Sequence, residues 1–195
     1  NAGVGFAGDA RDATLAQWRR VIDVNLMGVV HGTVAAYPVM AKQGSGHIVN
    51  ISSISAFLSD GGWSAYTMSK AAVEAFTNVL AVEMAPLGAS VVTVEPGAYN
   101  TDILKPALAR SVTKGFEADR SKMKPPDEVA TAVLQALSDA KPKRRYMIVP
   151  EQAQAAETIQ GAVDVLMQLN VDQAYTYDRA ELNRMMDKAA TRTGE

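Results

Sequence analysis

The chain has 195 residues, of which 48% are hydrophobic and 21% charged, a balance typical of a globular domain and not of a disordered segment. Its 19 basic and 21 acidic residues nearly cancel, so there is no basic field to hold a nucleic acid, and no nucleic-acid partner is expected. The absence of cysteine excludes disulfides, thiolate nucleophiles and zinc–thiolate sites, and with only His31 and His47 no metal site is predicted.

Short apolar runs bounded by Gly, Pro or Ser alternate with long stretches of helical periodicity, which indicates an α/β architecture. The connections between the β-branched runs are long enough for the crossovers that parallel strands require. The sequence therefore predicts a Rossmann-type, doubly wound parallel sheet with helices on both faces. In chain order, the expected elements are a helix over 12–42, a strand over 47–53, a helix over 63–86, a strand over 89–95, a helix over 127–139, a strand over 145–149, and helices over about 151–169 and 178–190.

The first residues of the chain are typical of the middle of such a fold and not of its first strand. Three strands are few for such a sheet, and no glycine-rich phosphate turn follows any of them. Asn1-Ala2-Gly3 is typical of the end of a strand whose beginning is missing, so we expect the chain to begin in mid-fold. Residues 1–150 are then the C-terminal portion of the sheet domain, and residues 151–195 a helical extension of it.

Tyr66 and Lys70 lie four residues apart in the expected helix 63–86, so they share one face of it. A phenol has a pKa of about 10, and a neighbouring ammonium favours the phenolate, so the pair suits proton exchange with an alcohol or carbonyl oxygen. Ser53 ends the preceding strand, where such a sheet presents its binding crevice, and Ser52 beside it is the alternative hydroxyl. By itself the Tyr–Lys spacing also fits a surface tyrosine stacked on a lysine stem.

The other short motifs around this pair make it far more specific. They are, in order, Asn1-Ala2-Gly3, Val24-Asn25-Leu26-Met27-Gly28, Asn50-Ile51-Ser52-Ser53, Tyr66-x-x-x-Lys70 and Pro96-Gly97-x-x-x-Thr101. From Asn1 to about Val149 the chain resembles the classical short-chain dehydrogenase/reductase family. The resemblance implies an NAD(P)-dependent oxidoreductase that interconverts a ketone or aldehyde and an alcohol by hydride transfer.

The resemblance also implies a role for each matched residue. Tyr66 is then the general acid/base, Ser53, favoured over Ser52 by the family spacing, orients the substrate oxygen, and Lys70 lowers the pKa of Tyr66 and holds the nicotinamide ribose. Asn25 completes the catalytic tetrad, in a helix whose backbone opens locally to hold a water that links Lys70 to solvent. The implied cofactor-binding residues are Asn1, Ala2, Gly3, Tyr66, Lys70, Pro96, Gly97, Tyr99 and Thr101.

The expected substrate is a small, hydrophobic carbonyl compound or alcohol, because acidic or basic substrates have no obvious partner in the sequence. Residues 101–124 have the length of a lid over the pocket. The resemblance implies three βα units of about 30 residues each before Asn1, which would include the glycine-rich turn for the phosphates and the residue that chooses between NAD and NADP. Either cofactor is therefore possible, and the activity of these residues alone is doubtful. The side chains expected to line the pocket are Phe57, Leu58, Trp63, Tyr99, Leu104 and Leu108.

Other expectations concern partners and location. No run of about 18 apolar residues is found, so we expect no membrane partner and a cytoplasmic protein. The family resemblance implies a homodimer or homotetramer through helices 12–42 and 63–86, and the basic run 141–145 is interpreted as a solvated turn. Three alternatives to the reductase hypothesis stay open: a nucleotide-binding protein without catalysis, a truncated chain without function, and an epimerase or dehydratase that uses the same Tyr–Lys pair.

Overall fold

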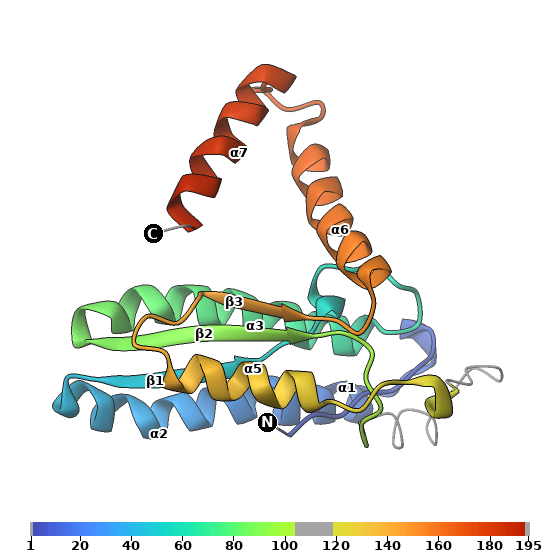
Figure 1. The fold of residues 1–195 in the computed structure, drawn as a ribbon. Coiled ribbons are helices and arrows are strands. Elements are labelled where there is room, and N and C mark those ends of the chain that lie inside the picture. The colour runs from blue at the N-terminus through green and yellow to red at the C-terminus, as the bar shows by residue number, and fades with distance from the viewer. Residues whose placement is uncertain (1, 104–118, 194–195) are drawn as a thin grey trace.

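The structure is a computed structural model that describes residues 2–103 and 119–193 (Figure 1). Its centre is a sheet with the spatial order β1 (Gly46–Ile51), β2 (Ala89–Pro96) and β3 (Arg145–Ile148). The described helices are α1 (Leu15–Ile22), the π-helical segment η2 (Asp23–Met27), α2 (Gly28–Gln43), α3 (Ser64–Met84), α5 (Asp127–Ser138), α6 (Gln152–Asn170) and α7 (Arg179–Thr193), with 3-10 turns at Ala10–Asp12, Ile54–Ala56, Ala85–Leu87 and Arg120–Lys122.

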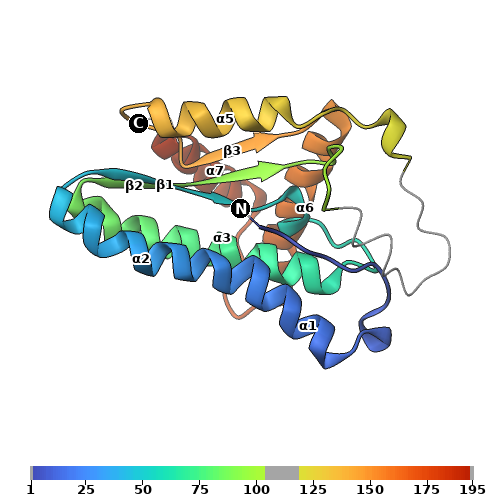
Figure 2. The same cartoon turned by 90° about the horizontal axis from the view of Figure 1, so that it is seen from below.

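All strands of this sheet are parallel. Ile48 of β1 is in register with Val91 of β2, and Val94 of β2 with Tyr146 of β3. Figure 2 shows α1, α2 and α3 on one face of the sheet and α5 on the other. The predicted parallel α/β sheet with helices on both faces is therefore confirmed.

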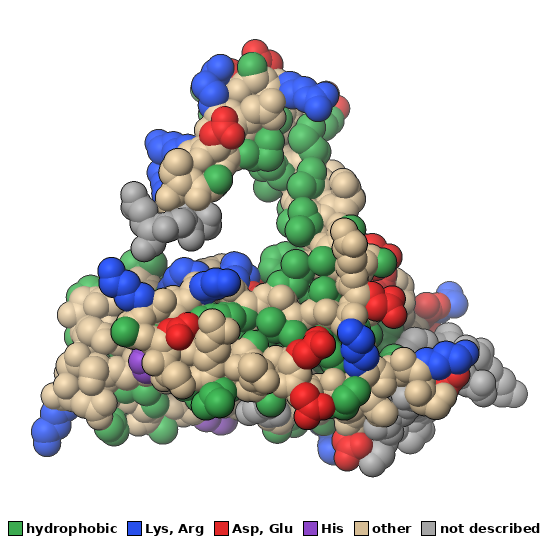
Figure 3. All heavy atoms as spheres, in the orientation of Figure 1, with side chains coloured by type: hydrophobic (Ala, Val, Ile, Leu, Met, Phe, Trp, Pro, Cys, Tyr) green, Lys and Arg blue, Asp and Glu red, His purple; other side chains and the backbone are tan. Residues whose placement is uncertain are grey.

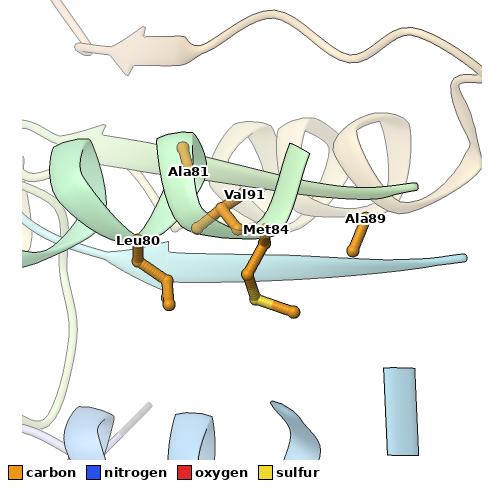
Figure 4. Close-up of a cluster of buried hydrophobic side chains, with 5 residues drawn as sticks. All are labelled: Leu80, Ala81, Met84, Ala89 and Val91. Atoms are coloured by element: carbon orange, nitrogen blue, oxygen red, sulfur yellow. The ribbon is translucent and has the colours of Figure 1, made fainter. Parts of the chain in front are cut away.

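Alternation along β2 divides the apolar core between the two faces of the sheet, since successive side chains of a strand point in opposite directions. On one face, Val91 packs with Leu80 and Met84 of α3 (Figure 4). On the other, Val92 packs with Ala136 of α5. This two-sided burial holds β2 in place and so positions the loops that follow the carboxyl ends of β1 and β2.

The predicted helix over 12–42 contains a widened turn. In η2 the N–H of Gly28 donates to the carbonyl of Asp23, five residues back, instead of four as in an α-helix. Asn25 lies in this segment and is buried. Apolar periodicity does not reveal one widened turn, but the local opening implied at Asn25 by the family resemblance is what the structure contains.

The helical run Leu15–Gln43 has 29 residues and a hydropathy of 1.3, long and apolar enough to cross a membrane by length and composition. The sequence prediction concerned an uninterrupted apolar run, and Asn25, His31 and Thr33 do interrupt this one. Residues 24–41 nevertheless carry no Lys, Arg, Asp or Glu, so a criterion based on mean hydropathy includes the helix. Here the run lies along the sheet (Figure 2), and one such helix is weak evidence for a membrane span.

The basic run 141–145 is not a solvated turn throughout. Arg144 donates from Nη1 to the carbonyl of Val91 (3.2 Å), and Arg145 begins β3 and pairs with the buried carboxylates of Glu74 and Glu95. The interpretation failed because the partners of these arginines lie 50 or more residues away in sequence.

Candidate active site

A cavity of about 920 Å³ opens at the carboxyl ends of β1 and β2, the edge where a parallel sheet presents its binding crevice. It brings together side chains from the strand ends, from α3 and from the segment after β2. Asn25 does not line this cavity but a second one, and Asn1 is outside the described residues. The predicted site residues that line it are Ala2, Gly3, Ser53, Tyr66, Lys70, Pro96, Gly97, Tyr99 and Thr101.

The two serines after β1 have different partners. Ser52 donates its hydroxyl to the carbonyl of Lys70 (3.2 Å), which ties the strand end to α3. Ser53 caps a 3-10 turn, where its Oγ accepts from the N–H of Ser55 (3.2 Å), and it also hydrogen-bonds Tyr66. Ser53 is thus the serine that meets the phenol, as the motif spacing predicts.

Burial raises the pKa of the Tyr66 phenol, and the hydrogen bond with Ser53 opposes this only in part. The expected lowering by Lys70 is not found in the structure. Lys70 Nζ lies 5.7 Å from the centroid of the Tyr66 ring and donates to the carbonyl of Ile51 (2.8 Å). Because the ammonium is held by the strand end, desolvation outweighs its attraction for a phenolate.

Burial also lowers the pKa of Lys70, to about 8, although the nearby carboxylate of Glu74 raises it. Between pH 8 and 10 the unfolded chain therefore binds more protons at Lys70 than the folded chain does. We expect the free energy of unfolding of the wild type to rise over this range relative to that of Lys70→Met, as measured by urea denaturation at each pH. Parallel pH profiles for the two proteins would contradict this.

Asn25 connects the N-terminal segment to α3. Its Oδ1 accepts from the N–H of Val4 (2.8 Å), and its Nδ2 donates to the carbonyl of Val4 (2.9 Å) and to Oγ of Ser69 (2.9 Å). Asn25 and Lys70 both line a second cavity of about 370 Å³ between α2 and β1. The widened helical turn, the buried amide and the lysine therefore meet at one place.

The turn after β2 is held from the C-terminal side of the chain. The N–H of Gly97 donates to the carbonyl of Ile148 (2.8 Å), and the N–H of Ala98 donates to Oε1 of Gln154 in α6 (3.0 Å). A Cβ at Gly97 would overlap Gln154 Oε1, so glycine permits this close approach. Sequence reasoning missed Gln154, because a glutamine in the first turn of a helix carries no distinguishing pattern.

Tyr99 links the same turn to α5. Its hydroxyl donates to Oε2 of Glu128 (2.8 Å), and burial together with this carboxylate raises the pKa of the phenol. The phenol of Tyr99 is therefore a structural hydrogen-bond donor, which distinguishes it from Tyr66 in the same cavity.

Helix α6 is seated on the loop after β1 through Gly161, where a Cβ would overlap the carbonyl of Phe57. We expect Gly161→Ala to destabilise the protein by about 1–3 kcal/mol, because the helix must move away from the loop. Gly32→Ala in α2 is the matched control: its Cβ would meet nothing, so a gain of up to about 1 kcal/mol is expected. Chemical denaturation measures the free energy of unfolding of both variants. Equal effects of the two substitutions would contradict a close contact between Gly161 of α6 and the carbonyl of Phe57.

Several predictions about the pocket lining need correction. Leu58, Trp63 and Tyr99 line the cavity, but Phe57 does not; its ring lies under the guanidinium of Arg145, 5.7 Å from the ring centroid. Leu104, Leu108 and most of the expected lid lie outside the described residues. Two carboxylates that the sequence did not single out, Asp60 and Glu157, also line the cavity.

A buried charge cluster lies one helical turn from Lys70. Arg145 Nη1 bonds both Glu95 Oε1 (2.9 Å) and Glu74 Oε2, and its Nη2 donates to Asn78 (3.1 Å). Burial raises the pKa of Glu95, whose Oε1 also accepts from Thr93 (2.5 Å). Glu74, four residues after Lys70, thus connects this cluster with the site.

Comparison with known proteins identifies the family. Residues 1–111 match the short chain dehydrogenase family. An uncharacterized oxidoreductase of Staphylococcus aureus is 35% identical over 142 residues, which are 72% of this chain and 57% of the relative. The chain therefore belongs to the short-chain dehydrogenase/reductase family and spans somewhat more than half the length of this relative.

Solved structures of this family have the same fold. A short-chain dehydrogenase from Sphingobium yanoikuyae in complex with NADPH is 29% identical, with a TM-score of 0.64 over 92% of this chain and 66% of that one. A short chain dehydrogenase/reductase from Burkholderia phymatum in complex with NAD is 26% identical, with a TM-score of 0.71 over 91% of this chain and 68% of that one. Structural neighbours thus bind either NAD or NADPH.

Proposed function

We propose that this chain carries the catalytic part of an NAD(P)-dependent oxidoreductase that interconverts a carbonyl compound and an alcohol. The observation that carries the proposal is the meeting of Ser53, Tyr66 and Lys70 at one cavity, with Ser53 bonded to the phenol and Lys70 beside its ring. Membership of the short-chain dehydrogenase/reductase family and the cofactors of the two solved structures support it.

The residues around the cavity fit the nicotinamide half of such a cofactor. Gly3 and Gly97 expose backbone to the cavity, and Thr101 adds a hydroxyl. Lys70 has three N–H donors, of which one bonds Ile51, so others remain for ribose hydroxyls. Hydride donation or acceptance is the chemistry that the nicotinamide supplies when bound. Nothing in these residues favours NAD over NADP.

In the reduction direction, Tyr66 donates its phenolic proton to the substrate oxygen, and in oxidation it accepts the proton from the alcohol. Burial raises its pKa and keeps it protonated, which suits the donor role. Ser53 hydrogen-bonds the same oxygen and fixes its distance from the phenol. A positive charge close to the ring, from Lys70 or from an oxidised nicotinamide, favours the phenolate that the oxidation direction needs.

After Tyr66 has given its proton to the substrate, it regains a proton through a relay that includes Lys70 and passes the η2 segment. Lys70 and Asn25 share the smaller cavity, which is large enough for water. The amide of Asn25 is engaged by Val4 and Ser69, so its contribution is to hold the widened turn in place.

The described cavity wall favours a neutral, largely apolar substrate. Leu58, Trp63 and Met123 supply apolar surface, and the carboxylates of Asp60 and Glu157 disfavour an anion. A medium-sized ketone, aldehyde or secondary alcohol is therefore the substrate class we propose.

The proposed function is tested by assaying a panel of such compounds with both reduced and both oxidised nicotinamide cofactors. The assay uses the whole protein as the cell makes it. The proposal expects a net change in nicotinamide absorbance that matches the product formed. Product without such a change indicates an epimerase or dehydratase, and cofactor binding without product indicates a non-catalytic nucleotide-binding protein. Either result overturns the proposal.

For assembly, we propose the predicted homodimer or homotetramer through α2 and α3. Val34 and Val39 of α2 and Val79 and Val82 of α3 are exposed, which supports a contact surface on these helices. A cytoplasmic location and the absence of a membrane partner stay proposals.

A further inference from the structure

The end of the chain leaves the body of the molecule. Residues 162–193, which we call the C-terminal arm, comprise the second half of α6, a turn and α7, and Figure 1 shows them projecting from the sheet. Among the described residues of the arm, Leu182 is buried, Asn170 and Glu181 are half-buried, and the others are exposed. Helices of this length are marginal in water without packing, so an arm this exposed needs a partner.

The angle between α6 and α7 is set by local hydrogen bonds. Asn170 donates to the carbonyl of Tyr177 and accepts from its N–H, both at 2.9 Å. Asp178 caps α7, with its Oδ1 accepting from the N–H of Glu181 (2.8 Å) and Glu181 Oε2 accepting from the N–H of Asp178 (3.1 Å). Leu182 packs at this elbow, so the two helices diverge from a defined joint and enclose a wedge.

Each helix of the arm carries a stripe of apolar side chains that is exposed to solvent. On α6 it continues from Ile159 through Val163 and Leu166, and Figure 3 shows hydrophobic side chains along the side of α6 that faces α7. On α7 it continues from Leu182 to Met185 and Met186, each methionine 47% exposed. Both stripes begin at or near buried residues and run on into solvent.

We propose that the occupant of the wedge is the arm of a second copy of this chain, with the two arms interlocked around a two-fold axis. A stable interface uses about 20–30 residues from each partner, and the arm supplies about this number. A two-fold axis makes one surface complementary to itself, so the stripes of two arms cover each other without any further chain.

Charge supports this occupant. The half of α6 that belongs to the arm carries Asp164 and no lysine or arginine, whereas α7 carries more basic than acidic residues. Because the elbow holds the two helices of one chain apart, α6 can meet a basic helix along its length only from another copy. Of the basic residues of α7, Arg179 and Arg192 lie beside the apolar stripe, whereas Arg184 and Lys188 lie on the side away from Met186; the acidic residues of α7 are Glu181 and Asp187.

These 195 residues contain no cysteine, so a cysteine introduced into the arm is the only thiol in this part of the chain, and the unsubstituted protein treated in parallel measures cross-linking through any other thiol. A single cysteine in the stripe, Met186→Cys, is compared with Lys188→Cys on the opposite side of α7, and both are treated with a bifunctional maleimide. We expect at least about tenfold faster formation of covalent dimers at position 186, because interlocking raises the local concentration of that thiol. Equal rates would overturn the proposal.

A second variant, Leu166→Asp with Met186→Asp, places charges in both stripes. These side chains are exposed in a single chain, so the core around β2 should stay folded, and the helical signal in circular dichroism should fall by no more than the contribution of the arm, while the mass from light scattering should fall to half. The mass should fall to half both for a wild type that is an arm dimer and for one that is a tetramer with a further contact through α2 and α3. A monomeric wild type, an unchanged mass in the variant, or an arm that binds lipid vesicles without change of mass overturns the proposal.

Discussion

Replacing Tyr66 by phenylalanine is expected to lower kcat by about a hundred- to ten-thousand-fold, the usual contribution of a positioned general acid/base. The phenol that bonds Ser53 at the cavity is lost, while the ring next to Trp63 and Lys70 stays. Cofactor affinity, measured by the fluorescence of the reduced nicotinamide, should therefore change little. The effect belongs to the proton-transfer step and not to binding.

Tyr37→Phe removes the same atom from a tyrosine of α2 that packs against the core away from the cavity, and it should leave kcat unchanged. Ser53→Ala should fall between the two variants, because Tyr66 can still donate its proton to a substrate oxygen that is less well placed. If Tyr66→Phe keeps more than about a tenth of the wild-type kcat, the general acid/base is another group.

The largest expected effect on stability comes from Arg145→Met. The guanidinium is shared by Glu74 and Glu95, whose side chains are 8% and 3% exposed, and its removal takes away the cation that pairs with both carboxylates, although Lys70 stays near Glu74. Breaking a buried pair in this way costs about 3–5 kcal/mol, and the partial exposure of Arg145 places the value near the lower limit. Since a whole domain is stable by only about 5–15 kcal/mol, urea denaturation should show a pronounced shift of the midpoint.

The loss should depend on pH and on the carboxylates. The pKa of Glu95 is already raised by burial, and it rises further without Arg145, so the folded variant binds more protons than the unfolded one as the pH falls. The difference in stability between wild type and variant should therefore become smaller at acidic pH, and Glu74→Gln with Glu95→Gln should recover part of it. Arg11→Met, which removes an exposed pairing with Asp9, is the control and should change stability by less than about 1 kcal/mol.

Much of the site could be predicted from the sequence because its parts are close in the chain or end a strand. Tyr66 and Lys70 share a helix face by their spacing, and Ser53 and Gly97 follow buried strands whose carboxyl ends meet at one edge. The predicted strands and helices agree with the structure to within a few residues, since each has its own periodicity and several are followed closely by a Gly or Pro.

Contacts between distant segments could not be predicted in this way. Gln154 meets the turn at Ala98, Arg145 meets Glu74, and Tyr99 meets Glu128, all across 29 or more residues. None of these pairs has a sequence pattern, because each depends on how α5, α6 and β3 return to the sheet. The raised pKa of Tyr66 could not be predicted from the sequence either, because it follows from the burial of the phenol in the folded chain.

The sequence by itself determined the fold class, the position of the candidate tetrad and the family, because hydrophobic periodicity and residue spacing act over short distances along the chain. Only the tertiary structure decided which groups are desolvated, that Lys70 is held by the carbonyl of Ile51, and that α6 contributes Gln154 to the cavity wall. The physical reason is that burial and the direction of a hydrogen bond depend on every segment that packs around a group, and these segments come from the whole length of the chain.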